Sequence, residues 1–203
     1  MLYLTWSTKN PRKHHAVVAL GVMRYLQSTI DIPLVLGGAS AVGQHVYADA
    51  SYGTAPQGRS VGGWYMSLGP NAGAVFAKAR ASMYTRLSSF EAELEFCCLA
   101  LRSLVRFGQL LGELGIEAGL PCMYGDNRAM VEFVSGSGVA KSVRHMEIRM
   151  WYARELFQKG GFEMMFLKGE KMPADGLTKV RSQSMHMEFM RDIQGLRLLE
   201  DSV

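Results

Sequence analysis

The sequence predicts an α/β fold, a mixed β-sheet with helices on its faces. The stretch "HVYADASYG" at residues 45–53 alternates like a strand, and "SVGGWYMSLGPNAGAVFAKA" at residues 60–79 predicts two more strands around a turn. These three strands favour an antiparallel meander. Helical patterns then alternate with two short apolar strands, "PCMYGDN" and "FEMMFLKG". The order is three strands, helix, helix, strand, helix, helix, strand, helix, which is typical of a mixed sheet flanked by helices.

Helical periodicity places the remaining elements. A helix is expected over residues 11–28, where Pro11 suits the first helical position. Residues 29–36 predict a short strand, followed by a linker at 37–44. Apolar residues recur at helical spacing from Ser88 to about Gly108. A second short helix is expected over 108–115, a long one over 139–160, and a last helical segment that starts at "MPADGLTK".

The composition indicates a globular protein with a real core. The chain has 203 residues, of which 48% are hydrophobic and 20% charged, and its net charge of +4 is compatible with a polyanionic partner. Three cysteines, Cys97, Cys98 and Cys122, lack metal-ligand spacing and are interpreted as reduced, which favours an intracellular protein. No stretch reaches the length of a membrane span, and the abrupt start suggests a piece of a longer polypeptide.

Four carboxylates stand out by their position. Asp49 lies in the middle of a strand, Glu93 beside a helical apolar stripe, Asp126 at the end of a buried strand, and Asp175 in the first turn of the last helical segment. Each has a simpler interpretation: Asp49 could lie at a solvated edge, Asp126 could cap a helix, Asp175 could favour a helix dipole, and Glu93 could be solvated. A strand interior, however, disfavours Asp49 unless a cation compensates it.

Taken together, these acids can converge at the ends of adjacent central strands. Carboxylate oxygens in such a cluster suit Mg²⁺. Two ions about 4 Å apart form the arrangement that promotes in-line phosphodiester cleavage.

Seven ordered blocks resemble the ribonuclease H region of Ty1/copia-type retrotransposon polyproteins. They are "STKNPRKHHAVVALGVMRYLQST", "YADASYG", "GGWYMSLG", "LSSFEAELEFCCLAL", "LGELGI" with "MYGDNRAM", "VRHMEIRMWYARE" and "PADGLTK", and they cover roughly residues 5–180. The resemblance implies an RNase H-like fold with a five-stranded sheet and an N-terminal helical extension. It also implies three segments: the end of a reverse transcriptase at 1–43, the RNase H-like domain at 44–180 and a helical tail at 181–203.

By this resemblance the chain hydrolyses the RNA strand of RNA–DNA hybrids with two Mg²⁺ ions, which Mn²⁺ can replace. Asp49 would contact both ions, with Glu93 and Asp126 completing one site and Asp175 the other. Glu91 is the rival of Glu93 for the helix position. Three departures, Gly53, Gly125 and Val180, remove no expected ligand. The stretch "LKGEKMPAD", which leads to the last acid, contains no histidine, and Glu170 or Lys168 stands in that region.

A basic row on the long expected helix is the candidate contact for nucleic-acid phosphates, although a solvated helix face would show the same pattern. The expected substrate-binding residues are Lys141, Arg144, His145 and Arg149 on this helix, together with Asn127, which directly follows Asp126. Expected partners are an RNA–DNA hybrid and the remainder of the reverse transcriptase polyprotein, with no membrane. The expected location is a cytoplasmic virus-like particle or the nucleus. The alternative function is that of a catalytically inactive or domesticated RNase H-fold module that acts in nucleic-acid binding or assembly.

Overall fold

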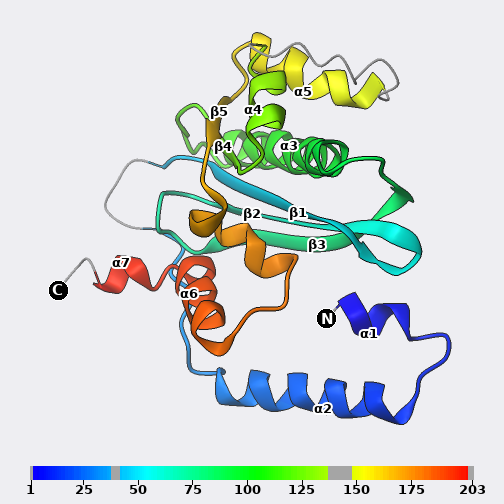
Figure 1. The fold of residues 1–203 in the computed structure, drawn as a ribbon. Helices are drawn as coiled ribbons and strands as arrows, with labels where there is room; N and C mark the ends of the chain where they lie inside the picture. Colours follow the sequence, from blue (N-terminus) through cyan, green and yellow to red (C-terminus); the bar gives the residue numbers. More distant parts are fainter. Residues whose placement is uncertain (1, 38–41, 137–147, 201–203) are drawn as a thin grey trace. The chain divides into compact units, whose positions relative to one another are not determined.

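A computed structural model describes residues 2–37, 42–136 and 148–200 of the chain (Figure 1). Contacts divide the chain into two units, residues 1–33 and 34–203. The smaller unit consists of α1 (Leu2–Trp6) and α2 (Lys13–Ser28). The division expected at residues 43 and 180 stays a prediction. Within the described ranges, no helix is long and apolar enough to cross a bilayer.

The larger unit is built on a mixed sheet of five strands in the order β3-β2-β1-β4-β5, which confirms the predicted fold class. Strands β1 (His45–Ala55), β2 (Arg59–Ser67) and β3 (Ala74–Thr85) form the antiparallel meander. A 3₁₀ turn, η1 (Pro56–Gly58), joins the first two. Strand β4 (Cys122–Gly125) pairs in parallel with β1, and β5 (Glu163–Phe166) pairs in parallel with β4. The central strand β1 therefore lies between β2 and β4.

Helices cover the two faces of this sheet (Figure 1). One face carries α3 (Ser89–Glu113), with α4 (Arg128–Val134) and α5 (Ile148–Gln158) beside it. The other carries the 3₁₀ turn η4 (Pro173–Leu177), preceded by η3 (Gly169–Lys171) and followed by α6 (Gln183–Gln194) and α7 (Arg197–Glu200). The main core lies between the sheet and α3, and includes Val46, Ala48, Trp64, Met66, Leu94, Phe96, Leu101, Met123 and Phe133.

Two adjacent glycines in β2 allow both layers to approach the sheet closely. A Cβ added at Gly62 would lie 2.0 Å from the ring of Phe96 on α3, and one added at Gly63 would lie 2.4 Å from the Cβ of Leu177 in η4. Gly63 pairs with Asp49 across the β1–β2 ladder. The glycine pair thus sets how near α3 and η4 come to the part of β1 that carries Asp49.

The start of α3 is fixed by polar contacts. The hydroxyl of Ser88 accepts a hydrogen bond from the Glu91 backbone N–H at 3.2 Å, which is a standard N-cap. The carboxylate of Glu91 accepts one from the Leu87 N–H at 3.1 Å. One turn further, a buried ion pair joins Arg86 Nε to Glu95 Oε2 at 2.8 Å. These contacts fix which face of the first helical turns points toward β1.

The structure corrects the strand expected at residues 29–36. This segment forms no strand, and residues 32–37 have irregular backbone. The Val35 N–H donates to the Gln194 carbonyl at the end of α6, and the Val35 carbonyl accepts from the Gly73 N–H. Pro33 has no N–H to offer a ladder, and the apolar side chains of Ile30, Leu34 and Leu36 are exposed, so the apolar pattern here reflects neither strand pairing nor core packing.

The helix boundaries also differ from those expected. The second short helix expected at 108–115 is the end of α3, which continues through Gly108 and Gly112 because burial of Leu111 helps to offset the cost of these helical glycines. The last helical segment is interrupted: η4 ends at Leu177 and α6 begins at Gln183 behind the N-cap Ser182. Of the long helix expected at 139–160, the structure describes α5, and residues 137–147 lie outside the described ranges.

We predict that Gly62→Ala lowers the free energy of unfolding by about 1–3 kcal/mol, because the added methyl overlaps the Phe96 ring in a packed core. Urea denaturation followed by circular dichroism measures this change. The matched control is Gly112→Ala in α3, where nothing lies within 4 Å of the added Cβ. That variant should be neutral or more stable by up to about 1 kcal/mol. Equal stability of Gly62→Ala and wild type would contradict the packing described.

Candidate metal centre

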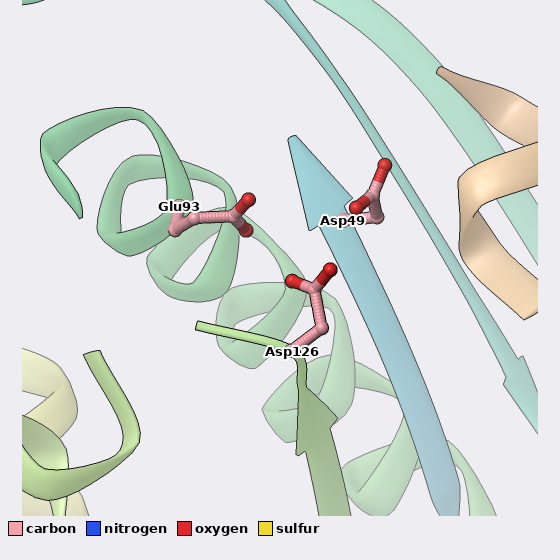
Figure 2. Close-up of side chains that lie close together, drawn as sticks. All are labelled: Asp49, Glu93 and Asp126. Atoms are coloured by element: carbon pink, nitrogen blue, oxygen red, sulfur yellow. The ribbon is translucent and has the colours of Figure 1, made fainter. Parts of the chain in front are cut away.

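Three of the predicted acids come together at one end of the central strands (Figure 2). Asp49 lies on β1, Glu93 on α3 and Asp126 directly after β4. Each offers a carboxylate oxygen, and these oxygens all lie within 4.8 Å of one another. The register explains the approach, since Tyr47 of β1 pairs with Tyr124 of the parallel strand β4 and the two aspartates follow two residues later.

Asp49 is the most deeply buried of the three acids, with 1% of its surface exposed. Its Oδ2 accepts a hydrogen bond from the Thr178 hydroxyl. Its Oδ1 is buried and has no hydrogen-bond partner among the described residues. An orphaned carboxylate oxygen beside two further carboxylates is the donor set that a hard divalent cation requires. The residues present therefore fit such an ion.

The electrostatics of the cluster are those of carboxylates crowded without compensation. Burial, reinforced by Asp49 and Asp126, raises the pKa of Glu93 to about 9. Burial also raises the pKa of Asp49, although the Thr178 hydrogen bond and the Lys179 charge oppose this shift. Burial raises the pKa of Asp126, with Lys179 again opposing. The cluster thus favours protons or a cation at neutral pH.

The two candidate glutamates of α3 have different surroundings. Glu93 is 7% exposed and points into the three-acid cluster (Figure 2). Glu91 lies in the first turn of α3, where its carboxylate accepts the Leu87 N–H. Geometry therefore favours Glu93 as the ligand and gives Glu91 a part in starting the helix.

Asp175, the fourth predicted acid, lies next to the cluster but outside the group of three. It occupies the first turn of η4, and its charge acts on both Asp49 and Asp126. Its Oδ1 accepts a hydrogen bond from Lys179 Nζ, and its Oδ2 accepts one from Arg181 Nη2 at 2.8 Å. Both carboxylate oxygens of Asp175 are thus held by cations of the chain itself.

Sequence reasoning missed three residues of this site. Thr178 and Lys179 belong to the "PADGLTK" block that identified Asp175, so their spacing behind that acid was a usable signal. Gly169 had no such signal. A Cβ at Gly169 would lie 3.2 Å from Asp126 Oδ2, so this glycine of η3 lets the backbone pass close to the acid.

The expected substrate-binding residues have different outcomes. Asn127 is the N-cap of α4, where its Oδ1 accepts the Met130 N–H at 3.1 Å. Arg149 belongs to α5, but its side chain is not described. Lys141, Arg144 and His145 lie outside the described residues. The phosphate-contacting row stays a prediction.

Comparison with known proteins gives a consistent picture. No family model matches the chain. It is 23% identical over 189 residues to a retrovirus-related Pol polyprotein from transposon TNT 1-94 of Nicotiana tabacum, covering 93% of this chain and 14% of the polyprotein. It is 26% identical over 185 residues to the Pol polyprotein from transposon RE2 of Arabidopsis thaliana, covering 90% of this chain and 13% of that one. The curated relatives are thus several times longer than this chain.

Among solved structures, LC11-RNase H1 isolated from compost matches with a TM-score of 0.54 and 16% identity, over 67% of this chain and 92% of the other. This likeness shows the RNase H fold. Together with the transposon relatives it confirms the resemblance found in the sequence: the chain is related to the Pol polyproteins of plant transposons and has an RNase H-like fold.

We predict that the metal-free protein loses stability as the pH rises from about 5 to 9. The pKa of Glu93 is raised from 4.5 to about 9 on folding, so between these values the folded state binds more protons than the unfolded state. Stability therefore falls with increasing pH across this window. Thermal melts in EDTA at a series of pH values measure it, and Glu93→Gln should flatten the dependence. A wild-type midpoint that rises across this window would contradict the buried cluster.

Proposed function

We propose that this chain is the ribonuclease H domain of a retrotransposon Pol polyprotein and hydrolyses the RNA strand of RNA–DNA hybrids. The observation that carries the proposal is the convergence of Asp49, Glu93 and Asp126 within 4.8 Å at the ends of adjacent strands, in a sheet of RNase H topology. Kinship with transposon Pol polyproteins supports the hybrid as substrate, because such hybrids arise during reverse transcription.

The proposed chemistry is two-metal-ion phosphodiester hydrolysis, with Mg²⁺ as the cofactor and Mn²⁺ as a substitute. Bound divalent cations would activate water and neutralise charge on the cleaved phosphate. Asp49, Glu93 and Asp126 would hold one cation, and Asp49 with Asp175 the other. Thr178 fixes the Asp49 carboxylate through its hydrogen bond to Oδ2, while Oδ1 has no hydrogen-bond partner among the described residues.

The partners proposed are the hybrid and the remainder of the polyprotein. The chain corresponds to 14% of the tobacco relative, so the larger part of such a protein lies beyond it. Residues 1–43 are proposed to be the end of the reverse transcriptase. The phosphate-contacting role proposed for the residues around α5 rests on the sequence alone.

We predict that the purified chain cleaves a labelled RNA–DNA hybrid in Mg²⁺ or Mn²⁺ and that Glu93→Gln lowers the rate at least about a hundredfold, on the scale of losing one preorganised electrostatic group. Asp49→Asn and Asp126→Asn should behave alike. The matched control is Glu91→Gln, which changes the same residue type in the preceding half-turn and should retain most activity. Gel analysis of single-turnover reactions measures each rate.

Two results would contradict the proposal. An inactive Glu91→Gln variant beside an active Glu93→Gln variant would show that Glu91, and not Glu93, is the helix ligand. A wild type that binds the hybrid in either metal without cleaving it would favour the inactive binding module instead.

A further inference from the structure

Lys179 introduces a positive charge among the acids of the centre. Its Nζ forms an ion pair with Asp175 and lies 4.0 Å from Asp49 Oδ1, the same oxygen that has no hydrogen-bond partner among the described residues. Its charge also acts on Asp126 and on Glu93. One ammonium group, in the segment between η4 and α6, therefore acts on all four acids.

Two basic residues hold Asp175, but they are not equivalent. The Arg181 side chain is 12% exposed and bonds both Asp175 Oδ2 and the Met172 carbonyl, so it is anchored at two points. The Lys179 side chain is 46% exposed and has a long flexible stem. Lys179 can therefore move into solvent, while Arg181 keeps Asp175 in place.

The position of Lys179 is the one that a second cation needs. The cluster of Asp49, Glu93 and Asp126 does not include Asp175, the acid with which Lys179 pairs. This cluster can therefore hold one divalent ion while Lys179 stays in place. A second ion between Asp49 and Asp175 would share their oxygens with the ammonium group. Two like charges cannot occupy that space together, so one must leave.

We propose that Lys179 is a resident counter-cation that occupies the second metal position until substrate arrives. The protein without nucleic acid then holds one divalent cation, at Asp49, Glu93 and Asp126. The phosphate of an incoming strand offers the ammonium group another anionic partner, and the second cation enters as Lys179 leaves. This inference rests on the proposed function for the metal centre, and it adds a substrate-dependent step that none of the acids explains.

The test counts bound Mn²⁺ in the absence of nucleic acid, from the paramagnetic resonance signal of the free ion. We predict one bound ion for wild type and two for Lys179→Gln at the same Mn²⁺ concentration. The dissociation constant of the second ion should be at least about tenfold lower in the variant than in wild type, a difference of about 1.4 kcal/mol. Lys179→Arg keeps the charge and should bind one. The matched control is Lys159→Gln, which breaks an exposed pair with Glu155 four residues earlier in α5 and should bind one.

The outcomes separate this inference from the proposed function. Two equivalent ions in wild type would overturn the inference without any variant, as would equal binding by wild type and a folded Lys179→Gln. The titration contains no hybrid, so a wild type that fails to cleave leaves the predicted change in ion number standing. A wild type that binds no Mn²⁺ would overturn the inference and the metal centre together.

A second measurement addresses the resident charge directly. In EDTA, Lys179→Gln should lower the thermal midpoint more than Lys159→Gln does, because it removes a cation from crowded carboxylates rather than from an exposed pair. Equal midpoints for the two variants would show that Lys179 compensates no buried charge, and would overturn the proposal.

Discussion

A carboxylate with 1% exposure in the middle of the central strand is the constraint on which the rest of the structure depends. Asp49 cannot be buried there alone, because an isolated charge out of water is strongly unfavourable. The chain compensates it from the far face of the sheet, with the Thr178 hydroxyl and the Lys179 ammonium group. These groups leave one oxygen of Asp49 without a hydrogen-bond partner in the described chain, and the Asp49 carboxylate lies beside two further acids.

The close packing of two layers on β2 makes this arrangement possible. Gly62 accepts the Phe96 ring of α3 on one face, and Gly63 accepts Leu177 of η4 on the other. A larger residue at either position would displace an element that carries an acid of the site. The same logic applies at Gly169, which lets η3 pass beside Asp126. Small residues therefore control the distances between charges that lie on separate elements.

The sequence predicted much of the fold and the acids, for identifiable reasons. Alternation predicted β1 and β2, and an aspartate inside a strand marked Asp49 as exceptional. Propensity could not show that Val35 bonds to Gln194 at the end of α6 and to Gly73 rather than to a strand, because those partners are distant in the sequence. Nor could it show that Lys179 and Arg181 both hold Asp175, since that depends on how the chain turns between η4 and α6.

The central claim is that Asp126 belongs to a cation-binding cluster rather than to a helix cap, and thermal melts of Asp126→Asn with and without Mg²⁺ test it most directly. Without metal, the variant should melt higher than wild type, because one repelling carboxylate is gone. With Mg²⁺, wild type should gain clearly more than the variant. Glu132→Gln, an exposed acid on α4, is the control. A variant that melts lower without metal and gains as much from Mg²⁺ would contradict the account.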